Sequence, residues 1–572
     1  MRIITRLERF HHSDIRRLLL GIIVTVGFVV LLVLCFGIPC PKTFCLSPVT
    51  VSVIELTNSN VTPVSVMNYI NLPDDDDDDN DNDNVDEEFE EGNNKKDLDR
   101  ENDVVISKEK VEINVSVIAR ENISLRNPKL VVDSSESDPN LVMVRVKDSR
   151  NGNVLSMRKH ERRGAISISQ MNSLLIQSLS SFKSPKPRWS SARDSEMLSA
   201  RFEIEKASAV HEFLGLNASV YRNISKFLRS YDLMERKLKV YVYKEGGKPI
   251  FHKPMPRGIY ASEGWFMKLM ESNKKFVVRD PRKAHLFYIP ISIKALRSSL
   301  GLNFQTPRSL ADHLKEYVDL IAGKYKFWNR TGGADHFIVA CHDWGNKLTK
   351  KTMKNSVRAL CNSNVAQGFR IGTDTALPVT YIRSAESPLE YLGGKTPSER
   401  KILAFFAGSM HGYLRPILVK LWENKEPDMK IVGPMPRDRE SKKQYREYMK
   451  SSKYCICARG YEVHTPRVVE AIINECVPVI IADNYVPPFF EVLNWEEFAV
   501  FVEEKDIPNL RNILLSISEE RYIVMQARVK AVQQHFLWHK KPVKFDLFHM
   551  ILHSIWHSRV YKVKTRKQRS GS

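Results

Sequence analysis

Short, uninterrupted apolar runs alternate with longer amphipathic stretches from residue 237 to about 560, and this alternation is the strongest constraint on the fold. The runs include KFVV (275–278), HLFYIPI (285–291), HFIVA (336–340), ILAFF (402–406), YCICA (454–458) and VPVII (477–481). Strands that are apolar at every position and separated by helices are typical of parallel sheets covered on both faces. The pattern therefore predicts an α/β fold.

A segment rich in Pro, Gly and Ser, 384–400, interrupts this pattern. Because the region is too long for one small sheet, we expect two α/β domains of similar size. The predicted order is a helical lead-in over 194–236, a first domain over 237–390, a second domain over 400–520, C-terminal helices over 521–560 and a basic tail over 561–572.

The first forty residues predict a single membrane anchor. Residues 18–38 form a run without any charged residue that is long enough to span a bilayer as a helix. Arginines cluster before the run, so the positive-inside rule places residues 1–17 in the cytosol and the rest in the lumen or outside the cell. A cleaved signal peptide is the alternative, but the run is long for one and no small-residue cleavage site follows it.

Residues 39–193 predict a disordered luminal stem. Within it, the run 74–91 holds 13 acidic residues and no basic one, so like-charge repulsion favours an extended chain. Six Asn-x-Ser/Thr triplets on the luminal side are candidate glycosylation sites: Asn60, Asn114, Asn122, Asn217, Asn223 and Asn329.

The chain carries a net charge of +20 in spite of the acidic run, which predicts anionic partners. A luminal location argues against nucleic acid. Nucleotide diphosphates, sulfated or uronic-acid glycans and lipid head groups remain as partners. No His/Cys array has zinc spacing and no DxD motif lies in the ordered part, so no metal site is expected.

Polar and glycine-rich segments follow the predicted strands, where ligands bind in open parallel sheets. After YCICA, Gly460 would let the backbone approach a ligand closely, and Thr465 would cap a helix that begins at Pro466. Arg467, in the first turn, suits a phosphate, and Glu470, one turn on, suits ribose hydroxyls. A surface ion pair between Arg467 and Glu470 is the alternative. The segment lacks the glycine patterns of dinucleotide-binding and P-loop proteins.

Other candidate groups flank the predicted strand HFIVA. Asp343 follows the strand at its carboxyl end, whereas Asp335 precedes it. Cys341 lies two residues before Asp343, and we interpret it as the partner of Cys361 in a disulfide rather than as a nucleophile, although the sequence alone does not fix the pairing of the eight cysteines.

The segments GADHFIVACHDWG, FFAGSMHGYLRPIL and YEVHTPRVVEAIINECVPVIIADNYVPPF resemble the exostosin-domain glycosyltransferases, and most of all their large plant branch, which acts on cell-wall polysaccharides. The similarity spans about 235–530. It implies a GT-B-like fold, in which two Rossmann-like domains face a cleft, and a single-pass type II Golgi anchor. It also implies inverting, metal-independent transfer from a nucleotide-sugar, with a UDP-sugar favoured and no further cofactor, and a disulfide between Cys455 and Cys476.

The resemblance also suggests roles for the candidate residues. The second domain would bind the donor, with Arg467 and Glu470 in the family's Arg-x-x-Glu region and Arg415 assisting the departing diphosphate. The first domain would bind a polysaccharide or glycoprotein glycan. Asp343 is the first candidate for the general base, and Asp335 is the second. The alternative is a non-catalytic partner in a Golgi synthase complex; association with itself or with other transferases stays open.

Two short segments depart from the usual pattern of the plant branch. The chain reads Leu377-Pro378-Val379 where members usually read Leu-Pro-Glu, which we expect to alter the acceptor side. It reads Cys457-Ala458-Arg459-Gly460 where members often read Cys-Pro-Ser-Gly, which we expect to add a positive charge beside the diphosphate.

Overall fold

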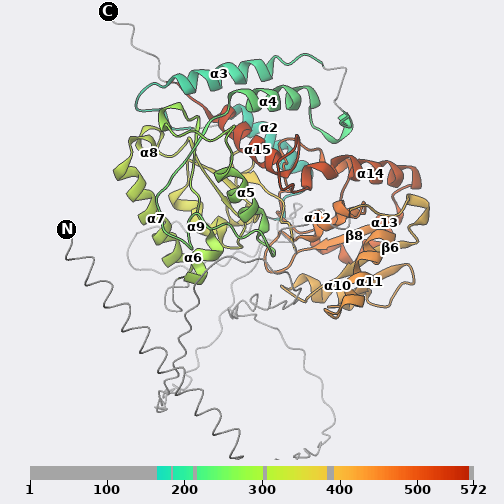
Figure 1. Ribbon diagram of the computed structural model, residues 1–572. Coiled ribbons are helices and arrows are strands. Elements are labelled where there is room, and N and C mark those ends of the chain that lie inside the picture. Colours follow the sequence, from blue (N-terminus) through green and yellow to red (C-terminus); the bar gives the residue numbers. More distant parts are fainter. Residues whose placement is uncertain (1–163, 182–183, 210–214, 300–305, 383–391, 566–572) are drawn as a thin grey trace, which may run out of the picture. The chain divides into compact units, whose positions relative to one another are not determined.

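Two parallel five-stranded sheets organise the chain in the computed structural model (Figure 1). The structure describes residues 164–181, 184–209, 215–299, 306–382 and 392–565. All of them belong to one compact unit that spans Glu90–Ser572. We call the part built on the first sheet the first lobe and the part built on the second sheet the second lobe.

The first sheet has the strand order β1-β2-β3-β4-β5, so its strands lie side by side in chain order. Its strands are β1 (Val240–Val242), β2 (Leu286–Tyr288), β3 (His336–Ala340), β4 (Val357–Leu360) and β5 (Thr375–Ala376). The helices between them are α5 (Ala261–Glu271), α6 (Ile293–Ser299), α7 (Pro307–Lys324), α8 (Lys326–Thr331) and α9 (Gly345–Thr352).

The second sheet has the order β10-β9-β8-β6-β7, so β6 lies between β7 and β8. Its strands are β6 (Ile402–Ala407), β7 (Met429–Val432), β8 (Ser452–Ala458), β9 (Val477–Ile481) and β10 (Val500–Phe501). Its helices are α10 (Leu414–Trp422), α11 (Arg439–Ser451), α12 (Arg467–Ile473), α13 (Leu510–Leu515) and α14 (Glu519–Val532).

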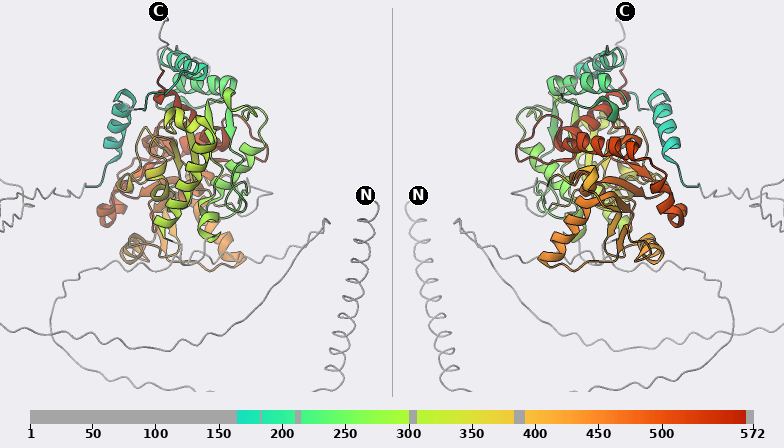
Figure 2. Two further views of the ribbon diagram at one scale, coloured as in Figure 1. Left: turned by 90° about the vertical axis from the view of Figure 1, so that its left-hand side faces the viewer. Right: turned by 90° about the vertical axis from the view of Figure 1, so that its right-hand side faces the viewer.

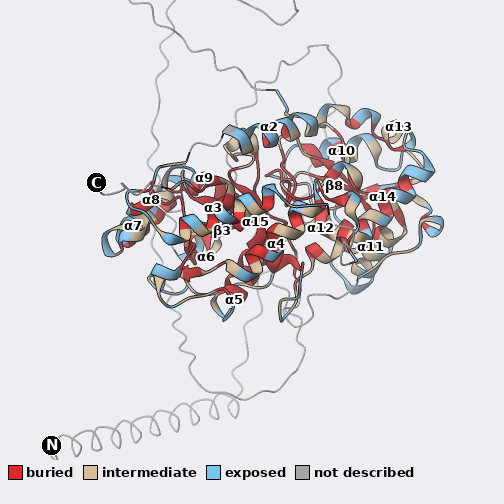
Figure 3. Ribbon diagram, turned by 90° about the horizontal axis from the view of Figure 1, so that it is seen from above, coloured by how far each residue is buried: buried red, intermediate tan, exposed pale blue. Residues whose placement is uncertain are grey.

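Burial on both faces explains why these strands form sheet interiors. Every residue of β3 and of β9 is buried, as the continuous apolar runs predicted. Figure 3 shows buried residues concentrated along the strands and along α12 and α15. Two disulfides tie neighbouring strands together, Cys341–Cys361 at the ends of β3 and β4 and Cys455–Cys476 between β8 and the start of β9. These are the two pairs anticipated above.

The last helix, α15 (Leu547–Lys562), packs against the first lobe although it follows the second lobe in the chain. It contacts α3 (Ala192–Glu205), α4 (Ile224–Lys237) and strands β4 and β5, and it lies beside α4 in Figure 1. Arg559 of α15 forms a buried ion pair with Asp194 of α3, with 2.9 Å between nitrogen and oxygen. The C-terminal helix therefore packs on the first sheet, and the lead-in helices pack on the C-terminal helix.

Three details of the fold differ from the expectations. A helix, α2 (Ile168–Ser181), forms at the end of the predicted stem because Met171 and Leu175, one turn apart, bury their side chains; it lies at the periphery in Figure 2. KFVV forms no strand, and Val277 makes only an isolated bridge to Val240. Strand β4 was not predicted because Arg358 interrupts its apolar pattern.

The predicted anchor, 18–38, the acidic run and the basic tail from residue 566 lie outside the described residues. Over the ranges that the structure describes, no helix is both long and apolar enough to cross a membrane. Asn60, Asn114 and Asn122 also lie outside these ranges. The other three candidate glycosylation sites, Asn217, Asn223 and Asn329, are exposed.

Candidate active site

The second sheet reverses its strand order between β6 and β8, and polar loops follow both strands at that point. β6 pairs with β7 on one side and with β8 on the other, and all three strands are parallel. Crevices form at such switch points because the two crossover connections leave in opposite directions, and ligands of open α/β sheets bind there. The loops concerned are 408–413 and 459–466.

Glycines allow these two loops to approach each other and to accommodate an arginine. Gly412 has a φ of +70°, and a Cβ there would lie 2.2 Å from the carbonyl oxygen of Gly460. A Cβ at Gly408 would lie 1.8 Å from Nη2 of Arg467. Both values are below any real contact distance, so a side chain at Gly412 would force the loops apart and one at Gly408 would displace the Arg467 guanidinium. The N–H of Gly460 donates to the carbonyl oxygen of Glu462 at 3.2 Å.

Arg467 reaches from α12 to the carboxyl end of β6. Its Nε and Nη2 donate to the carbonyl oxygen of Ala407 at 3.1 and 2.7 Å, and its guanidinium lies over the ring of Phe406. It does not form the expected alternative, an ion pair with Glu470, which instead accepts a hydrogen bond of 2.9 Å from the hydroxyl of Tyr445. Both side chains are partly exposed.

The start of α12 differs from the prediction. The residue before its first turn is Pro466, not Thr465, and the helix has only seven residues. The hydroxyl oxygen of Thr465 accepts from the backbone N–H of Arg467 at 3.4 Å, so Thr465 still supports this turn. Four of its five apolar residues are buried and Ile473 is partly buried, which agrees with the expectation of a largely buried helix.

Arg415 lies beside Arg467 and is buried in the same place. Its Nη1 donates to the carbonyl oxygen of Ser409 at 3.0 Å, and its Nε and Nη2 approach that of Ala458 at 3.4 Å. Burial, and then the neighbouring charge of Arg467, lower the pKa of Arg415 to about 9. Neither arginine forms an ion pair with any carboxylate in the described part of the chain. Two adjacent guanidiniums without a counter-charge favour an anion.

Arg459, the departure noted in the sequence, is already paired. Its Nη1 lies 3.4 Å from Oε1 of Glu504, and both side chains are mostly buried. The same carboxylate accepts the backbone N–H of Asp483 at 2.9 Å and the hydroxyl of Tyr413. Glu504 therefore offsets the positive charge that the sequence predicted at this position.

The end of β3 meets the second lobe through one ion pair. Oδ1 of Asp343 lies 3.1 Å from Nε2 of His464, and the Asp343 side chain is 23% exposed whereas His464 is buried. Burial would raise the pKa of Asp343, but the hydrogen bond and charge of His464, and the charges of His342 and Lys347, lower it overall. Asp343 is thus a charged carboxylate with partial access to solvent. Its partner His464 lies three residues before Arg467 in the sequence.

A second contact between the lobes was not foreseen from the sequence. Glu462 is buried, and its carboxylate accepts from Nε2 of Gln367 at 2.6 Å and from Nζ of Lys347 at 3.2 Å. Its only signal was its place in the polar loop after β8, two residues before His464. Glu462 and His464 together fix this loop against the first lobe.

Asp335 occupies the opposite end of β3 and is fully buried. It binds Nη2 of Arg330 at 2.7 Å, the hydroxyl of Thr331 at 2.6 Å and Nδ1 of His336 at 2.8 Å. Burial would raise its pKa, but the hydrogen bond and charge of His336 and the charges of Arg559 and Arg330 hold it well below its usual range. A carboxylate so enclosed has no access to an acceptor, and we do not retain Asp335 as a candidate base.

Two further titratable groups lie near the end of β3. Glu263 of α5 accepts the backbone N–H of Cys341 at 3.0 Å, and burial raises its pKa to about 7. Burial lowers the pKa of His342 to about 4, so this ring is neutral at neutral pH. Its Nδ1 accepts the backbone N–H of Trp344 at 3.1 Å. Glu263 was not singled out from the sequence.

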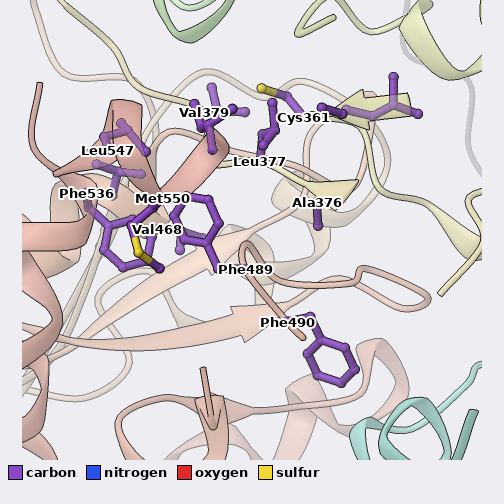
Figure 4. Close-up of a cluster of buried hydrophobic side chains, with 14 of the residues drawn as sticks. Cys361, Ala376, Leu377, Val379, Val468, Phe489, Phe490, Phe536, Leu547 and Met550 are labelled. Atoms are coloured by element: carbon purple, nitrogen blue, oxygen red, sulfur yellow. The ribbon is translucent and has the colours of Figure 1, made fainter. Parts of the chain in front are cut away.

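Val379 lies inside an apolar cluster rather than at an open surface. Its side chain is buried together with Leu377, Val468 and Phe489, which Figure 4 draws in one group. Val468 belongs to α12 and Leu377 follows β5, so residues of both lobes take part. The departure at Val379 therefore bears on apolar packing. Among the residues that the structure describes, no cluster of three metal-ligating side chains exists.

Comparisons of the sequence with known proteins identify its family. The family model described as the exostosin GT47 domain matches residues 234–517. A protein of Arabidopsis thaliana named a probable glycosyltransferase is 45% identical over 352 residues, 61% of this chain and 67% of that protein. A probable β-1,4-xylosyltransferase of the same plant is 31% identical and covers 56% of this chain and 81% of its own length. A probable glucuronosyltransferase of Oryza sativa subsp. japonica is 30% identical, with 56% and 80% covered.

Proposed function

This chain belongs to the exostosin GT47 family of glycosyltransferases, and we propose that it transfers a sugar from a nucleotide-sugar, with a UDP-sugar favoured, to a polysaccharide or protein-linked glycan. The names of these three plant relatives support a role in cell-wall polysaccharide synthesis. The uncharged run 18–38 and the arginines before it support a type II anchor in the Golgi membrane.

The observation that carries this proposal is the pair Arg415 and Arg467 at the switch point of the second sheet. Their guanidiniums lie beside glycines of the two loops, and within the described part of the chain their hydrogen-bond acceptors are carbonyl oxygens and the Thr465 hydroxyl. A diphosphate carries the negative charge that this place lacks. As the sugar leaves, charge accumulates on the diphosphate, and fixed positive groups stabilise it without a metal ion.

Glu470 lies one turn further along α12 and is the candidate for the ribose hydroxyls. The hydroxyl of Tyr445 holds one carboxylate oxygen at 2.9 Å. The hydroxyl thereby orients the carboxylate, whose remaining lone pairs can accept from a diol. Arg467 and Glu470 would then bind neighbouring parts of one nucleotide.

Asp343 is the candidate general base for an inverting transfer. In such a transfer the acceptor hydroxyl attacks the anomeric carbon on the face opposite the diphosphate, and its proton passes to a base. Asp343 is charged and partly exposed, and its partner His464 belongs to the segment that carries Arg467. The contact between Asp343 and His464 supports this proposal, because His464 lies in the loop that leads to Arg467.

A panel of UDP- and GDP-sugars incubated with the full-length protein tests this function. We expect one donor to raise the unfolding temperature and to be turned over. The variant Glu470→Gln keeps the shape of the side chain but removes its charge, so we expect turnover to fall at least about tenfold, as for a lost charged hydrogen bond. Glu440→Gln, at an exposed position of α11, is the matched control.

Two outcomes would contradict the proposal. Turnover of Glu470→Gln at the rate of the wild type would remove Glu470 from the donor site. If no donor is bound or turned over, and the protein instead binds a related transferase, the alternative of a non-catalytic partner in a synthase complex holds.

A further inference from the structure

An exposed aromatic ring lies on one of the two loops at the switch point of the second sheet. Tyr461, in the loop 459–466, is 52% exposed, although Gly460 before it and Glu462 after it are buried. The ring of His411, from the loop 408–413, packs against that of Tyr461, with 4.9 Å between the ring centroids and 56° between the ring planes. The two loops thus hold an aromatic pair, Tyr461 and His411, which we call the Tyr461 platform.

The Tyr461 platform borders the guanidinium of Arg415. A Cβ at Gly460 would lie 3.1 Å from Nη2 of Arg415 and 3.4 Å from Cβ of His411, so the backbone of Gly460 lies against both side chains. Burial and then the charge of Arg467 lower the pKa of Arg415, and the phenol of Tyr461 is among the groups that act in the opposite direction. Tyr461, the residue after Gly460, therefore lies near this guanidinium.

The order of the groups along the site indicates which part of a ligand the platform meets. A nucleotide-sugar is a linear molecule, in which the diphosphate lies between the ribose and the sugar. Glu470, the candidate for the ribose, follows Arg467 on α12, whereas Tyr461 lies in the preceding loop beside Arg415. With the ribose on Glu470 and the diphosphate on the two arginines, the group that continues past Arg415 is the sugar.

The loop that carries the platform also contacts the first lobe. Glu462, the residue after Tyr461, accepts from Nζ of Lys347 and Nε2 of Gln367. In an inverting transfer, the anomeric carbon lies between the diphosphate and the attacking acceptor hydroxyl. A ring held at the contact between the lobes is therefore in the right part of the site for the sugar.

We propose that the sugar of the nucleotide-sugar donor stacks its apolar face on the ring of Tyr461, with His411 supporting that ring. This inference rests on the proposed function, because it assigns a further part of the same donor. A pyranose presents C–H groups on its faces and hydroxyls around its edge, and a tyrosine offers a rigid apolar surface with a polar tip. The sugar would cover apolar surface that the protein alone leaves exposed, and this burial stabilises the complex.

A thermodynamic cycle tests the contact by removing the ring and the sugar separately. Calorimetry measures the affinity of the full-length protein and of Tyr461→Leu for UDP and for the UDP-sugars of the panel, or for GDP and the GDP-sugars if the panel selects those. Because the free diphosphate lacks the sugar, we expect Tyr461→Leu to change its affinity less than about twofold and to weaken the donor about five- to tenfold. Tyr461→Phe keeps the ring and should bind both ligands as the wild type does.

A distant ring and a measurement on the wild type serve as controls. Phe202 of α3 is 57% exposed and lies outside the two loops, so Phe202→Leu should leave both affinities unchanged. In the wild type, NMR saturation of the aromatic protons of the protein should reach the C–H protons of the sugar more strongly than those of the ribose. Weaker transfer to the sugar than to the ribose overturns the inference even if Tyr461→Leu fails to fold.

The cycle distinguishes failure of this inference from failure of the proposed function. An equal loss of affinity for the diphosphate and the donor in Tyr461→Leu, or no loss of either, overturns the inference and leaves the proposed function intact. A higher KM for the glycan acceptor with unchanged donor affinity also overturns it, since the ring would then contact the acceptor. If the wild type binds no nucleoside diphosphate and no nucleotide-sugar, the proposed function fails, and this inference fails with it.

Discussion

The two ends of β6 carry buried arginines whose surroundings differ in sign. At the start of the strand, Arg400 donates to four carbonyl oxygens, those of Lys395, Met449, Ser452 and Asn474, at 2.8 to 3.3 Å. Beyond the other end, Arg415 makes three bonds, two of them at 3.4 Å, and it has Arg467 as a neighbour. Burial lowers the pKa of both side chains.

The difference lies in what surrounds each charge. The carbonyls of Met449 and Asn474 belong to the C-terminal ends of α11 and α12, where the helix dipole is negative. Next in effect after burial, Tyr522 and Glu475 favour the charged form of Arg400, whereas Arg467 opposes the charge of Arg415. We interpret an arginine satisfied by the fold as structural, and an arginine placed against another arginine as the candidate for binding an anion. The absence of a carboxylate partner alone would not distinguish Arg400 from Arg415, because among the described residues neither has one.

The largest expected effect is on stability, at the start of β6. Arg400→Met leaves four carbonyls without their donor, so we expect the free energy of unfolding to fall by about 3–5 kcal/mol. Urea denaturation followed by circular dichroism measures it. If unfolding changes by less than about 1 kcal/mol, the carbonyls are satisfied by other means and the contrast with Arg415 fails.

The sequence predicts some strands of the fold and misses others. HFIVA and VPVII were predicted as strands to the residue because every position is apolar. β4 was missed because Arg358 lies in it. The partner that neutralises Arg358 is Asp374, directly before β5, and only the fold brings the two together. A pattern of apolar residues does not register a buried charge whose counter-ion is distant in the chain.

The site follows the same rule. Arg415, Arg467 and Asp343 could be selected because each follows a predicted strand, and position after a strand can be read locally. Their partners could not be selected, because Ala407 lies 60 residues from Arg467 and Asp343 meets His464 from the other lobe. The sequence therefore suggests which groups gather at an edge, and the fold decides which of them are already neutralised. Asp335, enclosed by Arg330 and His336, shows how a local reading alone misleads.

The next effect is on binding, at the far end of β6. Arg415→Met removes weak hydrogen bonds together with an unfavourable buried charge, so we expect the free energy of unfolding to change by about 1 kcal/mol or less. UDP should bind about 10- to 100-fold more weakly, because a charged hydrogen bond contributes about 1.5–3 kcal/mol. Calorimetric titration measures the affinity. If a folded variant binds UDP with unchanged affinity, Arg415 has a structural role, as Arg400 does.

The smallest effect is expected at Arg459, where the chain departs from the usual pattern of its plant relatives. Arg459→Ser restores the common residue and removes a charge that Glu504 already offsets at 3.4 Å. Because the pair is at the edge of the site and balanced, we expect UDP affinity to change less than about threefold and stability by less than about 1 kcal/mol. A loss of more than about tenfold would place Arg459 with Arg415 and Arg467 on the nucleotide. Glu504→Gln separates the two cases, since freeing a guanidinium that faces the diphosphate would tighten UDP binding.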